Sequence, residues 1–163
     1  MNLDNFDLEH LLLIAMKSEI DSNNLYSKMA KTTKNSFLQD KLKFLAAEEE
    51  KHRQFIEEIY LNHFPDKKIK IPEQTKVPLP IVKYDDDTPM SVLLQQAMNS
   101  EQAASEFYRS LASQFEEGSK IHNTLHYFSD MEIGHFKILE MEKQSMERFE
   151  EADVYWPMTH IGP

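Results

Sequence analysis

The sequence predicts an all-α protein, a bundle of four helices in a single domain spanning residues 1–163. Only three of the 163 residues are glycine, which leaves little material for the turns of a sheet-rich fold. Apolar residues recur at three- and four-residue steps in four stretches of the chain, as on the buried face of a helix. Five of the seven prolines lie together between the second and third stretches, where they predict a long non-helical connection.

The first two helices are expected over 5–31 and 36–63. The first apolar pattern begins after Asp4 or Asp7, and the second follows "TTKNS", which offers an Asn or Ser cap. Pro65 comes just after the second pattern and ends it. Because the link between these two helices is short, they should be antiparallel neighbours.

A crossover over 64–88 is expected to join the two halves of the bundle. A connection of this length can run along the whole bundle. The third helix is then expected over 89–116, with Thr88 as its cap and Pro89 in its first turn. Gly118 is expected to end that helix, because glycine favours the conformation that terminates helices.

The fourth helix is expected over 119–149, capped by Ser119 and antiparallel to the third. The remaining residues, 150–163, are apolar and contain two prolines. They are expected to form a docked terminal tail anchored by Trp156.

The composition excludes several classes of partner. The formal net charge of −10 and the pI near 5.1 argue against nucleic acid and anionic membranes, which both require clustered Lys and Arg. No segment approaches the ~20 apolar residues that span a bilayer. The chain has no cysteine, so disulfides, thiolate metal sites and iron–sulfur clusters are excluded. A cytoplasmic protein that binds cations is the expectation.

The two halves of the chain repeat each other. "AMKSE" at 15–19 returns as "AMNSE" at 97–101, and the same spacing relates Tyr26 to Tyr108. The pair Glu49 and His52 returns as Glu132 and His135, at a spacing that is longer by a single position. Two helical hairpins of common design are therefore predicted.

The repeated glutamates are expected to face inward. At ~100° per residue, Leu45 and Ile56 lie within about 40° of Glu49 on the helix, and Glu132 has equivalent apolar neighbours. Glu19 and Glu101 likewise lie within apolar stripes, two turns from a leucine and two turns from a tyrosine. A charged surface would have no reason to recur at the same place in both halves.

Four converging carboxylates in a core predict bound cations. Burial of an ionised carboxylate costs several kcal/mol or forces it neutral, and four would also repel one another. Two divalent ions balance four glutamates, and two neutral imidazoles complete the set. The predicted metal ligands are Glu19, Glu49, His52, Glu101, Glu132 and His135. The alternative is a buried ion-pair network of these six residues without metal.

Other polar residues receive lesser roles. Tyr26 and Tyr108 are predicted to hydrogen-bond the ligand carboxylates rather than bind metal. His122 and His126 are four residues apart, and His126, six residues before Glu132, lies about 120° from its stripe, so both are interpreted as surface histidines. A solvated helix face is expected to include Glu48, Glu50, Glu57 and Glu58.

At these residues the chain resembles the rubrerythrin-like branch of the ferritin-like superfamily, in "AEEEKH" and in "TPMSVLLQQAMNSEQAASEFYRSLA". A Glu from each of two helices plus Glu-x-x-His from the other two is the ligand set of ferritin-like di-iron and di-manganese proteins. The resemblance implies a ferritin-like four-helix bundle with a long crossover and a carboxylate-bridged di-iron centre. It also implies that Glu49 and Glu132 bridge, with Glu19 and Glu101 as terminal ligands.

Two departures from that family affect the expected chemistry. Full-length rubrerythrins carry a rubredoxin-like module with cysteine-bound iron, so this cysteine-free chain is expected to need an external electron donor such as a rubredoxin-like protein. Rubrerythrins also commonly place a further Glu where this chain has Ala104. The six remaining ligands are similar to those of bacterioferritin, although Glu50 stands where a haem-binding methionine would be expected.

Three functions fit the predicted site. The first is a di-iron oxidoreductase that reacts with hydrogen peroxide or oxygen. The second is a ferroxidase that stores or delivers iron, and the third is a di-manganese centre that disproportionates peroxide, because carboxylates and imidazoles accept Mn²⁺ as well as Fe²⁺. A homodimer is expected.

Overall fold

The computed structural model describes residues 3, 5–73, 79–80, 82 and 88–155, with side chains of the last helix described as far as 148. The described chain is all-α, as predicted, with four helices in the order α1 (Leu8–Thr32), α2 (Ser36–His63), α3 (Met90–Ala112) and α4 (Lys120–Tyr155). None of these helices is long and apolar enough to cross a membrane.

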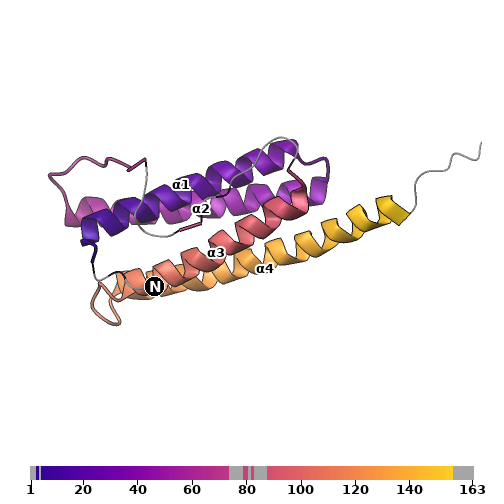
Figure 1. Cartoon of the computed structure of the whole chain (residues 1–163). Helices are drawn as coiled ribbons and strands as arrows, with labels where there is room; N and C mark the ends of the chain where they lie inside the picture. The colour runs from indigo at the N-terminus through magenta and orange to yellow at the C-terminus, as the bar shows by residue number, and fades with distance from the viewer. Residues whose placement is uncertain (1–2, 4, 74–78, 81, 83–87, 156–163) are drawn as a thin grey trace, which may run out of the picture.

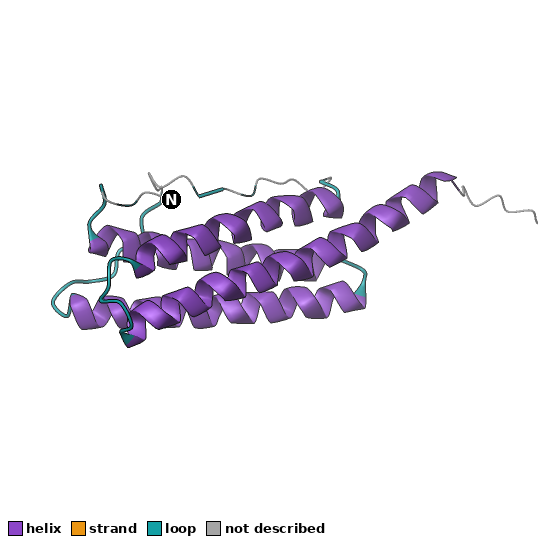
Figure 2. Cartoon of the chain, turned by 90° about the horizontal axis from the view of Figure 1, so that it is seen from below, coloured by secondary structure: helices purple, strands orange, loops and turns teal. Residues whose placement is uncertain are grey.

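The helices form two antiparallel hairpins, α1 with α2 and α3 with α4 (Figure 1). The hairpins meet where α2 faces α4 and α1 faces α3. Seen from below, the four helices run along a common direction (Figure 2). The bundle interior contains two apolar clusters, one around Leu12, Ile56 and Phe107 and the other around Leu38, Leu94 and Leu139. On α1 the first cluster ends at 16 and the second begins at 25, so polar side chains between them are enclosed by apolar residues on both sides.

The first hairpin agrees closely with the sequence prediction. Helix α1 begins at Leu8, three residues later than expected, because the Asp7 carboxylate accepts a hydrogen bond from the backbone N–H of His10 at 2.8 Å and fixes the N-terminus there. Helix α2 has the predicted bounds. The side chain of Asn35 caps it by accepting from the N–H groups of Phe37 and Leu38.

The predicted bounds of α3 were too wide. Pro89 has extended backbone angles (φ −56°, ψ 142°) and occupies the N-cap position predicted for Thr88, so the helix begins at Met90. The helix ends at Ala112, not at 116, and two tight backbone turns follow. In these turns Phe115 packs against the apolar core and lies edge-on to His63, with ring centroids 5.7 Å apart. Gly118 therefore lies in the loop and does not end α3.

Helix α4 is longer than predicted. Ser119 caps it as expected, because its hydroxyl accepts from the N–H of His122 at 3.2 Å. The helix continues to Tyr155, so residues 150–155 belong to it and not to a tail. No glycine or proline lies between Phe149, the predicted end of the helix, and Pro157. Figure 1 shows this end of α4 reaching beyond the other helices. The predicted tail residues 156–163, including Trp156, lie outside the described residues.

One residue of the predicted solvated face is buried. Glu48 is only 9% exposed, whereas Glu58 is exposed as predicted. Lys51, one turn further along α2, forms an ion pair with the Glu48 carboxylate. The lysine therefore compensates for the loss of water around this charge.

Replacement by alanine should change the stability in opposite directions at two glycines of the second hairpin. Gly134 is exposed within α4, and an added methyl group would meet no heavy atom within 4 Å. We expect Gly134→Ala to stabilise the protein by about 0.5–1 kcal/mol, raising Tm by a few degrees, because alanine loses less backbone entropy in a helix. Gly118 has as much space but a φ of +78°, so Gly118→Ala should destabilise by about 1–2 kcal/mol. Thermal melts of both variants would test this, and equal shifts would contradict it.

Candidate metal centre

Six polar side chains meet in the interior of the bundle, between the two apolar clusters. Each is at most 3% exposed. They come from all four helices: Glu19 from α1, Glu49 and His52 from α2, Glu101 from α3, and Glu132 and His135 from α4. The structure thus brings together every residue that the sequence predicted as a metal ligand. Their ligand atoms form two groups, each compact enough to hold a metal ion.

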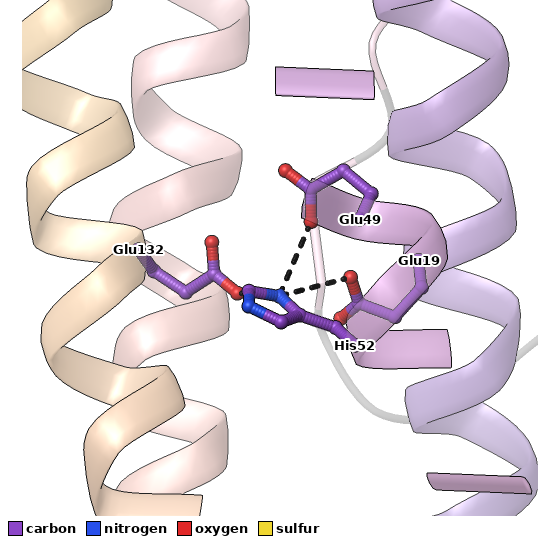
Figure 3. Close-up of side chains that lie close together, drawn as sticks. All are labelled: Glu19, Glu49, His52 and Glu132. Carbon is purple, nitrogen blue, oxygen red and sulfur yellow. Dashed lines mark ion pairs between the residues drawn. The ribbon is translucent and has the colours of Figure 1, made fainter. Parts of the chain in front are cut away.

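The first group is formed by Glu19, Glu49, His52 and Glu132 (Figure 3). The His52 ring lies between the carboxylates of the two hairpins. Its Nδ1 is 3.0 Å from Glu132 Oε1, 3.5 Å from Glu49 Oε2 and 3.7 Å from Glu19 Oε2. We call this group the His52 half-site.

The second group, the His135 half-site, is formed by Glu49, Glu101, Glu132 and His135. The Nδ1 of His135 is 2.9 Å from Glu132 Oε2, 3.2 Å from Glu49 Oε1 and 3.7 Å from Glu101 Oε2. Glu49 and Glu132 therefore belong to both half-sites, in the position that bridging ligands would take.

Each tyrosine crosses between the hairpins to hold a glutamate. The Tyr26 hydroxyl donates a hydrogen bond to Glu101 Oε1, and the Tyr108 hydroxyl donates to Glu19 Oε1. Burial and the negative charge of the bonded glutamate raise the pKa of both tyrosines well above the ordinary value. Both hydroxyls therefore keep their protons near neutral pH and fix one oxygen of each glutamate, leaving the other oxygen to face the cluster.

The electrostatics of the cluster favour positive charge. Burial disfavours the imidazolium form of His52, but the surrounding carboxylates of Glu132, Glu19 and Glu49 outweigh burial and raise its pKa to about 12. His135 is affected in the same way, by burial and then by Glu101, Glu132 and Glu49, and its pKa is also strongly raised. The carboxylates thus keep both buried histidines in the positively charged imidazolium form, although burial alone would favour the neutral form.

The pKa values of the buried glutamates are shifted in different directions. Burial raises the pKa of Glu19 and Glu101 well above the ordinary value, and the charges of neighbouring glutamates raise it further. Burial would also raise the pKa of Glu132, but the two histidines outweigh it and lower the value to about 2. The four carboxylates cannot all be ionised without more positive charge than the histidines supply.

Unpartnered buried atoms show that hydrogen bonds within the cluster leave its polar groups unsatisfied. Among the described residues, the buried side-chain atoms without a hydrogen-bond partner are Glu19 Oε2, Glu49 Oε1, His52 Nδ1, His52 Nε2 and Glu132 Oε1. His52 Nδ1 and Glu132 Oε1 are 3.0 Å apart, yet they lack the alignment of a hydrogen bond. Such unpaired groups are rare in folded proteins and call for an explanation such as an ion. Carboxylates and imidazoles are suitable ligands for Fe²⁺ and Mn²⁺, so the residues present fit two metal ions.

Comparison with known proteins agrees with this architecture. The family model described as Rubrerythrin matches residues 10–89, which include Glu19, Glu49 and His52. The solved structure of a hypothetical protein from Pyrococcus furiosus is 31% identical, with a TM-score of 0.80 over 91% of this chain and 95% of that chain. The chain belongs to the rubrerythrin family. No curated protein matches it.

The remaining predicted positions lie outside the cluster of this rubrerythrin-family chain. His122 and His126 are half-buried near the start of α4, with ring centroids 4.6 Å apart, and belong to neither half-site. Ala104 is half-buried on α3, one turn after Glu101. Its methyl side chain offers no ligand atom to either half-site.

Sequence reasoning missed the polar contacts that hold each hairpin together near the ligands. In the first hairpin, the Asn23 amide donates to the backbone carbonyl of Ala46 at 2.6 Å. In the second, the Ser129 hydroxyl donates to the carbonyl of Ser105 at 2.9 Å. Ser105 is the repeat equivalent of Asn23, and Ser129 is the repeat equivalent of Ala46. The two contacts join equivalent positions, but the donor lies on the first helix of one hairpin and on the second helix of the other, so residue types alone did not reveal them.

Proposed function

We propose that this protein is a non-haem di-iron oxidoreductase that reduces hydrogen peroxide at the buried Glu/His cluster. The observation that carries the proposal is the pair of half-sites sharing Glu49 and Glu132. Two adjacent metal positions can hold both oxygens of one small substrate. Membership of the rubrerythrin family supports an oxidoreductase over a structural role.

Two bound ferrous ions would each supply one electron, and these two electrons together with two protons would convert one hydrogen peroxide into two waters. The chain's own residues would provide the environment. Glu49 and Glu132 would be shared between the two ions, while Glu19 with His52 and Glu101 with His135 would complete the two ends. Tyr26 and Tyr108 orient the terminal glutamates, and the apolar clusters on both sides restrict water.

The proposed reaction needs an electron source outside these residues. The 163 residues contain no cysteine that could bind a second iron centre. We therefore propose an external reductant such as a rubredoxin-like protein. Oxygen is the alternative oxidant, and a homodimer remains our proposal for the assembly.

Anaerobic stopped-flow mixing would test the proposed function. We expect protein loaded with two Fe²⁺ ions to be oxidised by peroxide much faster than free Fe²⁺, and faster than it is oxidised by oxygen. Rates no higher than those of free iron would contradict the proposal. Faster reaction with oxygen, followed by uptake of many irons per chain, would instead indicate the ferroxidase and storage function.

A further inference from the structure

The two half-sites are related by the internal repeat but differ in their surroundings. The repeat exchanges His52 with His135 and Glu19 with Glu101. The tyrosine contacts obey the same exchange, since each tyrosine binds the terminal glutamate of the opposite hairpin. With equal surroundings, the two half-sites would bind metal equally. Unequal metal binding would therefore have to come from differences in packing and hydrogen bonding around the two histidines.

Among the described residues, a phenylalanine ring packs against His52, and no equivalent ring packs against His135. The Phe128 ring lies against His52, with centroids 4.1 Å apart and planes inclined by 33°. Phe128 is itself held edge-on by Phe55 at 5.2 Å and by Tyr108 at 5.6 Å. The repeat that relates the two histidines places Leu45 at the position equivalent to Phe128 in the first half of the chain. Among the described residues the ring nearest to His135 is His52 itself, at 5.9 Å.

The hydrogen bonding of the two histidines also differs. Neither nitrogen of His52 has a hydrogen-bond partner, and Glu19 Oε2 beside it is also unpartnered. In contrast, His135 Nδ1 forms a hydrogen bond with Glu132 Oε2 at 2.9 Å. An ion entering the His135 half-site must replace this hydrogen bond, whereas an ion entering the His52 half-site displaces only ion-pair contacts of 3.0 to 3.7 Å that lack hydrogen-bond alignment.

From these two differences we infer that the half-sites bind metal unequally. The His52 half-site takes the first ion tightly, and the His135 half-site takes the second ion more weakly and exchanges it more readily. Phe128 is a positioning residue that holds the His52 ring in its binding orientation and binds no metal itself. The inference rests on the metal centre of the proposed function, but it does not depend on the reaction with peroxide.

An anaerobic titration of metal-stripped protein with Co²⁺ would test the inference without any catalytic measurement. Visible absorption reports the coordination of each ion, and calorimetry gives the two dissociation constants. We expect two steps whose constants differ by about tenfold or more, the usual effect of groups that orient a ligand. His52→Ala should remove the tight step, whereas His135→Ala should remove the weak step and keep the tight one.

Phe128→Leu gives a sharper test, because it copies the residue that the first half of the chain has at this position. We expect it to weaken the first step about tenfold and to leave the second step unchanged, so that the two steps approach each other. Phe55→Leu is the matched control, since it removes a ring from the same aromatic group without a described contact to His52. Thermal melts of both variants would establish that they fold.

The outcomes separate the inference from the proposed function. Two equal steps in the unmodified protein, loss of the tight step in His135→Ala, or equal effects of Phe128→Leu and Phe55→Leu would each overturn the inference while leaving a two-metal centre. If Co²⁺ and Fe²⁺ both failed to bind, the proposed function would fall together with the inference. If the leucine variants did not fold, the comparison of the two histidine variants would still decide.

Discussion

Replacing Glu49 or Glu132 by alanine is expected to reduce the metal content from two ions per chain to one or fewer. Both carboxylates belong to both half-sites, so either substitution removes a ligand from each ion. It also removes negative charge that lies 3.2 Å or less from the histidine of the opposite hairpin. Elemental analysis of protein loaded with excess Fe²⁺ without oxygen and then desalted would measure the change.

Controls for this experiment come from neighbouring acidic residues. Glu48 precedes Glu49 on α2 and is also buried, but it pairs with Lys51. Glu142 is buried on α4 and pairs with Lys41. Alanine at either control position removes a buried carboxylate outside the cluster, and we expect it to leave two ions per chain. Retention of two ions in Glu49→Ala or Glu132→Ala would count against the ligand assignment.

Metal affinity is expected to rise steeply with pH. When metal is removed, protons take the place of the ions. The raised pKa of His52, about 12, means that this imidazole stays protonated throughout the neutral range in the metal-free protein. The groups that face it are Glu19 from α1, Glu132 from α4 and Tyr108 from α3, together with Glu49 of its own helix. Metal must displace this proton, so higher pH favours binding.

The terminal glutamates, Glu19 and Glu101, should also make metal binding tighter as the pH rises. The raised pKa values of Glu19 and Glu101 mean that these carboxyls hold protons to higher pH than ordinary glutamates. Each half-site then releases about two protons per ion, one from a histidine and one from a glutamate, which corresponds to about a hundredfold change in Kd per pH unit while both groups are protonated in the metal-free form. The dependence of Kd on pH should become weaker above the pH at which the glutamate is already ionised in the metal-free protein.

Calorimetric titrations with Co²⁺ in buffers of different ionisation enthalpy would count the released protons directly. The slope of log Kd against pH should agree with that count. Glu142→Ala should give the same slope, because its carboxylate lies outside the cluster. A Kd independent of pH across the neutral range would contradict the electrostatic account of the site.

The six candidate ligands were predictable because local geometry and the repeat constrain them. Residues three apart on a helix project to one side, which places Glu49 with His52 and Glu132 with His135. The repeat then relates Glu19 to Glu101. Neither argument needs the tertiary structure. The inward orientation of all six residues followed from the apolar residues around them.

The features that the sequence did not predict depend on packing between distant segments. Helix α3 ends at Ala112 because Phe115 packs back on the core beside His63, a contact between residues far apart in sequence. Glu48 was expected in solvent because the helical pattern of α2 alone does not show which of its outer positions the folded chain covers. The packing of Phe128 against His52 likewise depends on how α4 lies against α2, so the inference of unequal half-sites required the structure.

Crystals grown anaerobically with Fe²⁺ and measured at the iron absorption edge would test the central claim most directly. We expect two anomalous peaks inside the bundle, one beside Glu19 and His52 and the other beside Glu101 and His135, with Glu49 and Glu132 contacting both. Density showing the same six side chains bonded only to one another, with iron absent or on the surface, would contradict the account.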